Sequence, residues 1–395
     1  MKKLIFLILS VAVSSTWAFS QGCLPEGITF TTQEQVDSFQ INYPTCTHIL
    51  ADVIIYDDII NLSGLSNITQ IDGSLTILST WALINLSGLH NLDTIGNDLT
   101  IGAGYIWFGN YALTSLSGLE SLAYIGGNLQ ISDNDELTDL SGINNLAIVE
   151  GDFIIYACNN LENLTGLENL TSIGGNFLID GNTFLHSLSG LDNLTSIGGY
   201  LRFGLCWGCG TEPEAPHNNP RLESLTNLSN LTTIGGDLQI MGCDSLSSLS
   251  GLNNISAGTI TNIYIAGNTL LSSCDATSIC NYLSSPNGEI IIQENAPGCN
   301  SQQEVEAACN QVSTESIGFD DEILLFPNPA GKTVTISGNK GTTIREIVIY
   351  NQTGQKVLQG KPVNNTLGIS NLRPGLYILE LLTDQWKMRK KLMVE

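Results

Sequence analysis

The sequence is dominated by a repeat of about 24 residues. Eight tetrapeptides of the Leu-Ser-Gly-Leu type recur at spacings of 24, 30, 24, 24, 24, 37 and 24 residues, beginning at Leu62, Leu86, Leu116, Leu140, Leu164, Leu188, Leu225 and Leu249. A fixed period in this range, rich in Leu, Ile, Asn and Gly, is typical of a solenoid in which each repeat forms one coil. We therefore expect a leucine-rich β-solenoid over about residues 47–273.

One coil can be read from residues 126–148. Leu129 and Ile131 alternate with polar residues, as in a short strand with one buried face. Asn134 follows as a turn residue, and later apolar residues are expected to point inward, at Leu137, Leu140 and Ile143. Gly-Gly pairs at residues 126–127, 174–175, 198–199 and 235–236 predict positive φ angles at one corner. The pattern predicts mainly β structure, with parallel strands stacked coil on coil and Asn side chains forming a ladder along one corner.

Charge divides the chain into two parts. Of the 38 acidic residues, 34 lie between Gln21 and Glu322, where Arg202 and Arg221 are the only basic residues; residues 323–395 carry 10 basic and 4 acidic residues. A shift this sharp indicates a domain boundary. The acidic part would repel nucleic-acid phosphates and anionic lipids, which argues against a role in binding either. Its acidity would also keep an exported protein soluble.

The N-terminus has the pattern of a secretory signal peptide. Two lysines precede the apolar run Leu4–Val13, so residues 1–20 are interpreted as a signal with cleavage after Ala18 or Ser20. The run is too short to span a membrane, and no later stretch reaches about 18 apolar residues. Cys23 follows closely, but its sequence context is poor for a lipid anchor. We expect an exported protein without a transmembrane segment.

Most of the ten cysteines fit disulfides that close the ends of the solenoid, as expected of an exported protein. Cys23 and Cys46 bracket residues 21–46, which we interpret as an N-terminal cap. Residues 274–309 form a C-terminal cap whose four cysteines allow three pairings: Cys274, Cys280, Cys299 and Cys309. Solenoids need caps because their end coils otherwise expose an apolar interior.

Cys158 and Cys243 occupy the position that asparagine fills in sister coils, at Asn134, Asn182, Asn219 and Asn268. Leucine-rich repeats accept either residue here, because both can satisfy buried backbone groups at the turn. The two cysteines are three coils apart, about 14 Å at about 4.8 Å per coil, whereas a disulfide requires Cα atoms within about 7 Å. We therefore predict two unpaired, buried thiols.

These features resemble those of receptor L domains, the leucine-rich β-helices of insulin- and growth-factor-receptor ectodomains. The matching residues are Cys46-Thr-His-Ile before the first strand and the recurring pattern L-x-x-L-S-G-L-x-N-L-T-x-I-G-G-x-L-x-I, over about residues 46–273. The resemblance implies a right-handed parallel β-helix. It implies no catalytic residue and no particular ligand.

The two longer spacings place insertions on one edge of the solenoid. Six extra residues lie between Ile101 and Asn110 and thirteen between Phe203 and Asn219, and insertions in solenoids collect on the binding side. Exposed aromatics suit stacking on sugar rings or anchoring a protein partner. The aromatic residues at this same point of their coils, with or without an insertion, are our candidate ligand-binding residues: Trp81, Tyr105, Trp107, Phe108, Tyr111 and Trp207. The alternative is that each loop packs its aromatics onto its own coil.

The longer insertion carries Cys206 and Cys209, whose C-x-x-C spacing also occurs in redox and zinc sites. A redox motif would need a βαβ context and zinc a second pair of ligands, so a local disulfide is favoured and no metal site is predicted. Arg202 and Arg221 flank the insertion and either balance nearby glutamates or meet an acidic ligand. The acidic turn at Asp133 suggests calcium only superficially, because it lacks the glycine of an EF-hand loop. No cofactor is expected, and calcium dependence stays open.

No catalytic constellation emerges from the sequence. A polysaccharide lyase needs a strong base, and the repeats offer only two arginines; a glycosidase needs two carboxylates across a cleft, which 34 acidic residues satisfy by chance. The four histidines are scattered, with no nucleophile pattern beside them. We predict that the protein is not an enzyme.

A different domain occupies residues 323–395, after a polar linker at 310–322. Strand-like runs at 333–337, 344–350 and 376–382, separated by turns, predict a small antiparallel β-sandwich. The basic residues of the chain are concentrated in this domain.

This tail closely resembles the type A sorting domain of the type IX secretion system of Bacteroidetes. The matching segments are Phe326-Pro-Asn-Pro329, Ile349-Tyr-Asn-Gln-Thr-Gly354, Pro374-Gly-Leu-Tyr377 and Arg389-Lys-Lys391. The resemblance implies a sorting motif of Pro327, Asn328, Pro329, Gly354, Gly375, Tyr377, Lys390 and Lys391. It further implies the type IX machinery as partner, export across the outer membrane, removal of the tail and often attachment to surface lipopolysaccharide.

Taken together, these features predict an exported or cell-surface recognition protein that binds a glycan or a protein along its aromatic edge. The alternative is a structural or adhesive surface component without a specific ligand. A polysaccharide-active enzyme ranks third.

Overall fold

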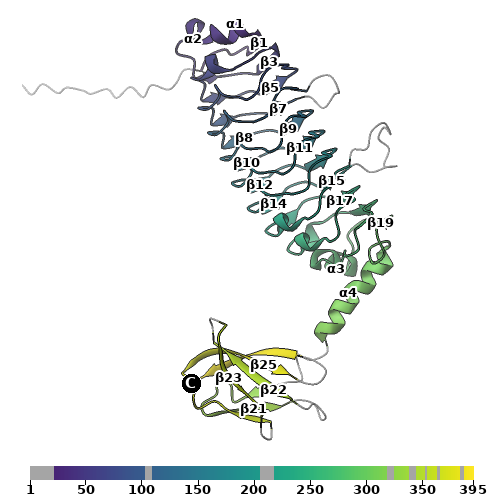
Figure 1. Cartoon of the computed structure of the whole chain (residues 1–395). Coiled ribbons are helices and arrows are strands. Elements are labelled where there is room, and N and C mark those ends of the chain that lie inside the picture. Colours follow the sequence, from purple (N-terminus) through teal and green to yellow (C-terminus); the bar gives the residue numbers. More distant parts are fainter. Residues whose placement is uncertain are drawn as a thin grey trace, which may run out of the picture. The chain divides into compact units, whose positions relative to one another are not determined.

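The computed structural model describes residues 22–102, 109–204, 218–317, 324–337, 344–351, 354–362, 365–382 and 387–395. The chain forms two compact units, which divide between Cys309 and Asn310 (Figure 1). The hydrophobic core of the first unit runs from Phe30 to Val305, and that of the second from Ala330 to Val394. Each unit therefore buries its own apolar side chains.

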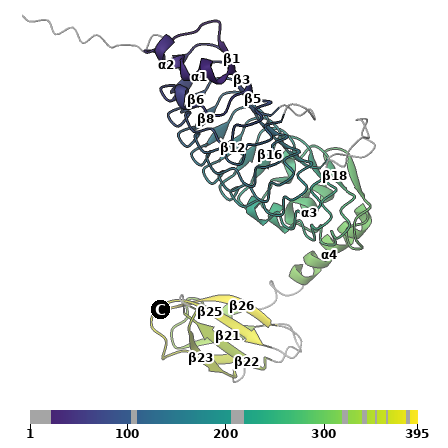
Figure 2. The same ribbon diagram turned by 45° about the horizontal axis from the view of Figure 1, so that its top comes forward.

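The first unit is a solenoid built on two parallel sheets that follow its length (Figures 1 and 2). The longer sheet contains, in order across it, β1 (Ile28–Thr32), β3 (Val53–Asp58), β5 (Leu75–Leu78), β7 (Leu99–Ile101), β9 (Leu129–Ser132), β11 (Phe153–Tyr156), β13 (Phe177–Asp180), β15 (Leu201–Phe203), β17 (Leu238–Met241), β18 (Ile263–Ala266) and β19 (Ile290–Gln293). The shorter sheet contains β2 (His48–Ile49), β4 (Gln70–Ile71), β6 (Thr94–Ile95), β8 (Tyr124–Ile125), β10 (Ile148–Val149), β12 (Ser172–Ile173), β14 (Ser196–Ile197) and β16 (Thr233–Ile234). The predicted parallel β-solenoid is confirmed.

Register places equivalent residues of successive coils side by side. Leu129 of β9 lies opposite Leu99 on one side and Phe153 on the other, and the rings of Phe153 and Phe177 stack at 5.2 Å. In the coil that begins at residue 126, the inward-facing residues are all at most 1% exposed: Leu129, Ile131, Leu137, Leu140, Ile143, Leu146 and Val149. Apolar side chains that recur every 24 residues thus form continuous rows, which explains how so short a repeat builds a dry interior.

The conformation predicted for the Gly-Gly pairs was wrong, because none of these glycines has a positive φ. Glycine is required there because the backbones of successive coils approach each other closely. A Cβ on Gly126 would lie 2.2 Å from the carbonyl oxygen of Gly96 in the preceding coil. Positive φ occurs in the Leu-Ser-Gly-Leu segments, for example 120° at Gly142. A Cβ on Gly142 would also lie 2.3 Å from the backbone carbon of Leu116.

Short helices and disulfides close both ends of the solenoid. The helices are α1 (Gln33–Asp37), α2 (Phe39–Asn42), α3 (Thr277–Ser284) and α4 (Gln302–Ile317), with 3₁₀ turns at Ser63–Leu65, Thr226–Leu228, Ser250–Leu252 and Ala257–Thr259. The disulfides join Cys23 to Cys46, Cys274 to Cys299 and Cys280 to Cys309, with Cα–Cα distances of 5.6, 5.6 and 5.5 Å. Helix α4 extends beyond residue 310, so the segment interpreted as a polar linker is helical as far as Ile317.

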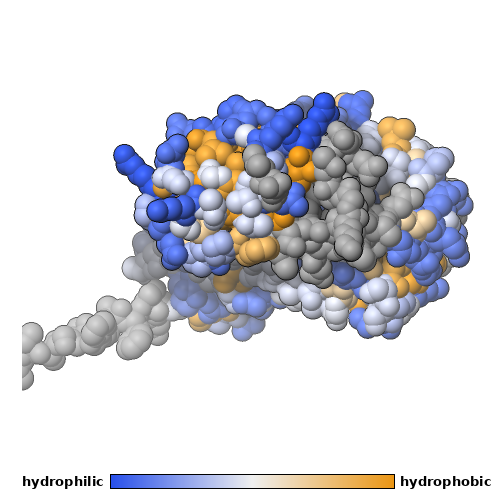
Figure 3. Space-filling model, turned by 90° about the horizontal axis from the view of Figure 1, so that it is seen from below, coloured by the Kyte–Doolittle hydropathy of each residue, from blue (hydrophilic) through white to orange (hydrophobic). Residues whose placement is uncertain are grey.

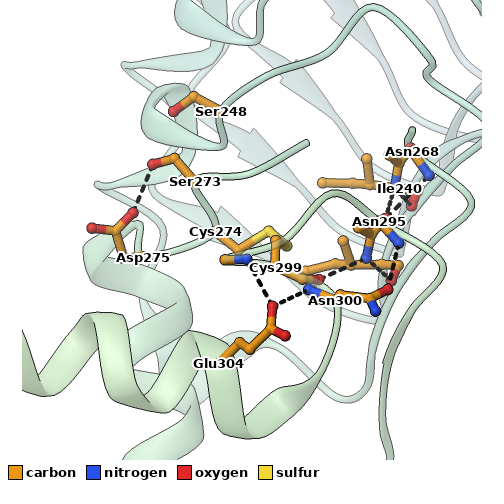
Figure 4. Close-up of a disulfide and its surroundings, with 12 residues drawn as sticks. Ile240, Ser248, Asn268, Ser273, Cys274, Asp275, Asn295, Cys299, Asn300 and Glu304 are labelled. Carbon is orange, nitrogen blue, oxygen red and sulfur yellow. Dashed lines mark hydrogen bonds between the residues drawn. A yellow bond between two sulfur atoms is a disulfide. The ribbon is translucent and has the colours of Figure 1, made fainter. Parts of the chain in front are cut away.

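Figure 4 shows the C-terminal cap around the Cys274–Cys299 disulfide. Oε2 of Glu304 accepts from the backbone N–H groups of Gly298 at 2.7 Å and Asn300 at 2.9 Å. Nδ2 of Asn295 donates to the carbonyl oxygen of Cys299 at 3.0 Å. Helix α4 and the last turn of the solenoid are therefore tied together by polar contacts beside the disulfide.

The second unit consists of two antiparallel sheets. One contains β20 (Leu324–Phe326), β21 (Thr333–Ser337) and β24 (Thr366–Gly368), and the other β23 (Lys356–Gly360), β22 (Glu346–Tyr350), β25 (Gly375–Leu382) and β26 (Lys387–Val394). The three strands predicted from the sequence are present, and four shorter or more polar strands join them. Among the described residues of the whole chain, no helix has the length and hydrophobicity needed to cross a membrane.

Candidate functional site

Buried asparagines form one corner of the solenoid, directly after the strands of the longer sheet. Nδ2 of Asn182 donates to the carbonyl oxygen of Ile155 in the preceding coil at 3.1 Å, and its Oδ1 accepts from the N–H of Cys158 at 3.0 Å. The same role recurs along the corner, where the buried members are Asn110, Asn134, Asn182, Asn219, Asn268 and Asn295. Each side chain hydrogen-bonds backbone groups of the neighbouring coil. The ladder therefore fixes where the residues directly after each asparagine lie on this edge of the solenoid.

Cys158 and Cys243 are unpaired and fully buried within this ladder. Sγ of Cys158 lies 3.7 Å from the carbonyl oxygen of Ile131, where an asparagine amide would donate. Burial raises the pKa of the Cys158 thiol to about 12 and also raises that of Cys243. Both thiols are therefore protonated and poorly nucleophilic at neutral pH, which does not suit a catalytic cysteine.

Trp81 and Tyr111 meet on the outer surface of this edge. Thr80 occupies the asparagine position of its coil and donates to Oδ1 of Asn110 at 2.7 Å, so Trp81 and Tyr111 each follow the ladder by one residue. Their ring centroids are 4.9 Å apart, with planes inclined by 18°, and Trp81 is 56% exposed. The two rings thus form a stacked pair between adjacent coils, in which Trp81 faces solvent and Tyr111 is half-buried.

Two of the six candidate aromatic residues are brought together in this way. The remaining four lie outside the described residues: Tyr105, Trp107, Phe108 and Trp207. Cys206 and Cys209 also lie there. Among the described residues, the aromatic edge therefore consists of the Trp81–Tyr111 pair and its surroundings.

Ile60 and Ile84 extend the exposed apolar surface of the same coils, and sequence reasoning missed both. Each is 57% exposed, and each lies one residue after an inward-facing residue, Ile59 or Leu83. We call Ile60, Trp81, Ile84 and Tyr111 the apolar edge patch. The available signal was a comparison between repeats, because the equivalent residues of several later coils are polar.

The described contacts of the two solenoid arginines are with an aspartate and with aromatic rings, whereas Glu212 and Glu214 of the insertion lie outside the described residues. Arg202 forms an ion pair with Asp180 of the neighbouring strand, whose side chain is only 4% exposed, and its Nε donates to Oδ2 of Asp180 at 3.1 Å. The guanidinium carbon of Arg221 lies 4.0 Å from the ring centroid of Phe184. Arg202 is therefore neutralised on the outer face of the longer sheet, and Arg221 forms a cation–π contact on the edge.

Exposed apolar side chains occur in both units. Among the described residues, the large ones that are at least half exposed are Ile41, Ile60, Trp81, Ile84, Leu270 and Phe326. The space-filling view shows hydrophobic residues reaching one face of the molecule among hydrophilic ones (Figure 3). Within the described ranges, no group of three or more His, Cys, Asp or Glu side chains is arranged to hold a metal ion.

In the tail, Asn328 connects the Pro-Asn-Pro segment to the last strand. Its Nδ2 donates to the carbonyl oxygen of Lys391 at 3.1 Å, and its Oδ1 accepts from the N–H of Met393 at 2.8 Å. The peptide bonds before Pro327 and Pro329 are cis. Residues that are far apart in the sequence motif are thus adjacent in space.

The other motif residues lie in turns or on β26. The hydroxyl of Tyr377 donates to the carbonyl oxygen of Arg373 at 2.8 Å, and Gly354 has a φ of 76° in the turn after β22. Gly375 begins β25 with a φ of 155°. Lys391 is exposed and Lys390 half-buried, and both lie on β26.

Comparison with protein families agrees with both parts of the structure. Residues 324–395 match the family described as Secretion system C-terminal sorting domain, and residues 104–182 and 123–199 match the family described as Receptor L domain. A search of curated proteins found no match. The chain therefore combines a receptor-L-like solenoid with a sorting domain of the type IX secretion system, which directs secretion to the outer surface or the extracellular space. Neither matched family is an enzyme family.

Proposed function

We propose that this protein is a recognition protein that binds a glycan or a protein at the cell surface or outside the cell. The supporting observation is the Trp81–Tyr111 pair, an aromatic stack with Trp81 exposed, at a repeat position where the next coils carry polar residues. Aromatic side chains of this kind dominate binding energy at interfaces because they bury a large area with few rotatable bonds. The solenoid positions the pair rigidly, and the sorting domain delivers it to the surface.

Recognition is favoured over catalysis by the chemistry of the edge. The side chains of Ile60, Trp81 and Ile84 can bury area against a ligand but cannot act as a general acid or base, and the hydroxyl of Tyr111 is the one titratable group among the four side chains of the patch. The buried thiols of Cys158 and Cys243 are protonated, with pKa values raised by burial. Binding a ligand requires exposed surface area that can be buried, and the edge provides such area.

The test is a binding screen of the full chain against glycan and surface-protein libraries, with and without calcium. A Trp81→Ala, Tyr111→Ala double variant is expected to lose about tenfold or more in affinity for any ligand found. The matched control is Thr183→Ala, Thr269→Ala, which changes the same repeat position in other coils. A Trp107→Ala, Trp207→Ala variant tests the insertions separately.

Three outcomes separate the candidate functions. Loss of binding only in the Trp81 or Trp107 variants, with unchanged circular dichroism, supports recognition through this edge. A ligand that every variant retains would place the site on another face. If the unmodified chain binds nothing in either library, a structural or adhesive surface component replaces the recognition protein.

A further inference from the structure

The apolar edge patch is not required by the solenoid fold, because the repeats provide an internal comparison. Position A, one residue after the asparagine ladder, carries Trp81 and Tyr111 in successive coils and then Asp135, Asn159 and Thr183. Position B, one residue after the next inward-facing residue, carries Ile60, Ile84 and Thr114 and then Thr138, Glu162 and His186. The strands of these coils, from β3 to β13, pair in the same register. The exposed apolar residues of the first coils therefore need a reason other than folding.

Carboxylates border the patch at both ends. Asp57 and Asp58 precede Ile60 in the first coil, and Asp135 and Glu136 occupy the coil beyond Tyr111; Asp58 and Glu136 are exposed. The sequence from Gln21 to Leu201 contains no lysine or arginine. The ligand that complements this surface electrostatically is apolar at its centre and cationic at its rim.

The geometry of the aromatic pair disfavours a sugar. The rings of Trp81 and Tyr111 cover one face of each other at 4.9 Å, so the pair does not form a flat platform for a chain of pyranose rings. Among the described residues, those next to the pair along the chain and on the edge are Ala82, Ala112, Ile60 and Ile84, which have no hydrogen-bonding group, so the polar groups are limited to the indole N–H, the Tyr111 hydroxyl and the carboxylates at the ends of the patch. Sugar sites combine a free ring face with placed polar groups, whereas an apolar cluster beside a stacked pair suits a protein anchor.

We infer that the partner of the apolar edge patch is a protein segment with apolar side chains flanked by lysine or arginine. This inference rests on the proposed recognition function and narrows its ligand to one class. A second copy of the solenoid fits less well, because two surfaces with 34 acidic and two basic residues between Gln21 and Glu322 repel each other. An acidic polysaccharide is disfavoured for the same reason.

The test uses the full chain and synthetic peptides of equal length as probes. One peptide alternates leucine with lysine, a second serine with lysine, and a third leucine with glutamate; cellohexaose and chitohexaose represent neutral glycans. The patch variant is Ile60→Ser, Trp81→Ser, Ile84→Ser. The matched control is Ile41→Ser, Leu270→Ser, which removes exposed apolar side chains, 80% and 60% exposed, outside the patch. Affinities are measured by calorimetry, and circular dichroism verifies that each variant is folded.

We expect the leucine–lysine peptide to bind at least about tenfold more tightly than the other two peptides, and the patch variant to lose about tenfold or more of that affinity. The control variant should bind like the unmodified chain. Equal binding to the patch variant, or no preference for the leucine–lysine peptide, would overturn the inference. Binding of an oligosaccharide that the patch variant loses would overturn it too, but would leave the proposed recognition function standing.

Discussion

At the scale of single residues, the asparagine ladder shows why one position of the repeat accepts only certain side chains. Nδ2 of Asn134 donates to the carbonyl oxygens of Ile101 at 3.0 Å and Ser132 at 2.9 Å. Cys158, in the next coil, offers only a sulfur 3.7 Å from the equivalent carbonyl oxygen of Ile131. Sulfhydryl groups are weak donors, so the cysteine position is a weaker version of the same contact.

Substitutions at Asn134 and at Cys158 should therefore change the free energy of unfolding in opposite directions. Asn134→Ala leaves buried carbonyl groups without a donor and should lower the free energy of unfolding by about 3 kcal/mol. Cys158→Asn restores the amide donor at a site where sister coils already accommodate it and should raise the free energy of unfolding by about 1 kcal/mol. Urea unfolding followed by circular dichroism measures both. A Cys158→Asn protein less stable than the unmodified chain would show that the cysteine is needed for packing.

The buried Cys158 thiol also makes stability depend on pH. Burial raises its pKa from 9.0 to about 12, so above pH 9 the unfolded chain releases this proton while the folded chain retains it. Stability is then lost as pH rises, by about 1.4 kcal/mol per pH unit for this group between pH 9 and pH 12. Cys158→Ala should lessen the decline in unfolding free energy between pH 9 and pH 10.5. Identical slopes for the two proteins would contradict the assignment.

At the scale of elements, the residues predicted to form the sorting motif bring two distant segments of the tail into contact. Asn328 lies between two prolines and forms two hydrogen bonds with the backbone of β26, and the N–H of Ala330 donates to the carbonyl oxygen of Met393 at 2.8 Å. These bonds hold the Pro-Asn-Pro segment beside the exposed Lys391. A surface read by the secretion machinery would then depend on the position in which Asn328, itself exposed, holds this segment against β26.

Asn328→Ala should reduce delivery to the cell surface, because both side-chain bonds to β26 are lost. The expected result is retention of a large part of the protein inside the outer membrane, measured by comparing surface-accessible and total protein in the native host. Gln359→Ala is the control, since the two side-chain bonds of this exposed residue lead only to other side chains, Lys356 and Glu346. Normal delivery of the Asn328 variant would show that this contact is dispensable for export.

The sequence predicted those elements whose residues recur with the period of the repeat. Leu129 and Leu99 pair across β9 and β7 because the same residue type returns once per coil, so reading one coil predicted all of them. The Gly-Gly conformation was mispredicted because a glycine required for close approach and one required for positive φ look the same in a sequence. Helices α1 and α2, at five and four residues, are too short for a helical period to be visible.

The candidate site was predictable only in part, for a related reason. Trp81 and Tyr111 could be identified as aromatic residues at the same point of successive coils, the second of which carries an insertion, and their stacking follows from one coil of separation. Ile60 and Ile84 were missed because an exposed isoleucine looks like a core residue unless its coil position is compared with others. The Arg202–Asp180 pair joins neighbouring strands diagonally, because Leu178 is the residue opposite Arg202, so the register of the repeat does not point to it.

At the scale of the whole molecule, the two units differ in how they fold. In the solenoid, each coil packs on its neighbours, so stability accumulates along the axis and depends on closed ends. The sorting domain has a separate core in which β22 and β25 pair across the chain. No residue belongs to both hydrophobic cores, which predicts that the solenoid remains folded when the sorting domain is removed.

Two truncations test this independence. A chain ending at Asn310 keeps both C-terminal cap disulfides, because Cys299 and Cys309 remain, and its solenoid should melt at the same temperature as in the full chain. A chain ending at Ser273 loses β19 and the cap and uncovers the row that contains Ile263 and Ile265, both fully buried in the intact protein. That chain should aggregate or unfold without a cooperative transition, since an open solenoid end exposes its apolar interior. Calorimetry of the three proteins distinguishes the possibilities. A solenoid transition that shifts on removal of residues 311–395 would mean that the units stabilise each other. An unchanged transition would mean that the tail can be removed after export without lowering the stability of the solenoid that carries the recognition surface.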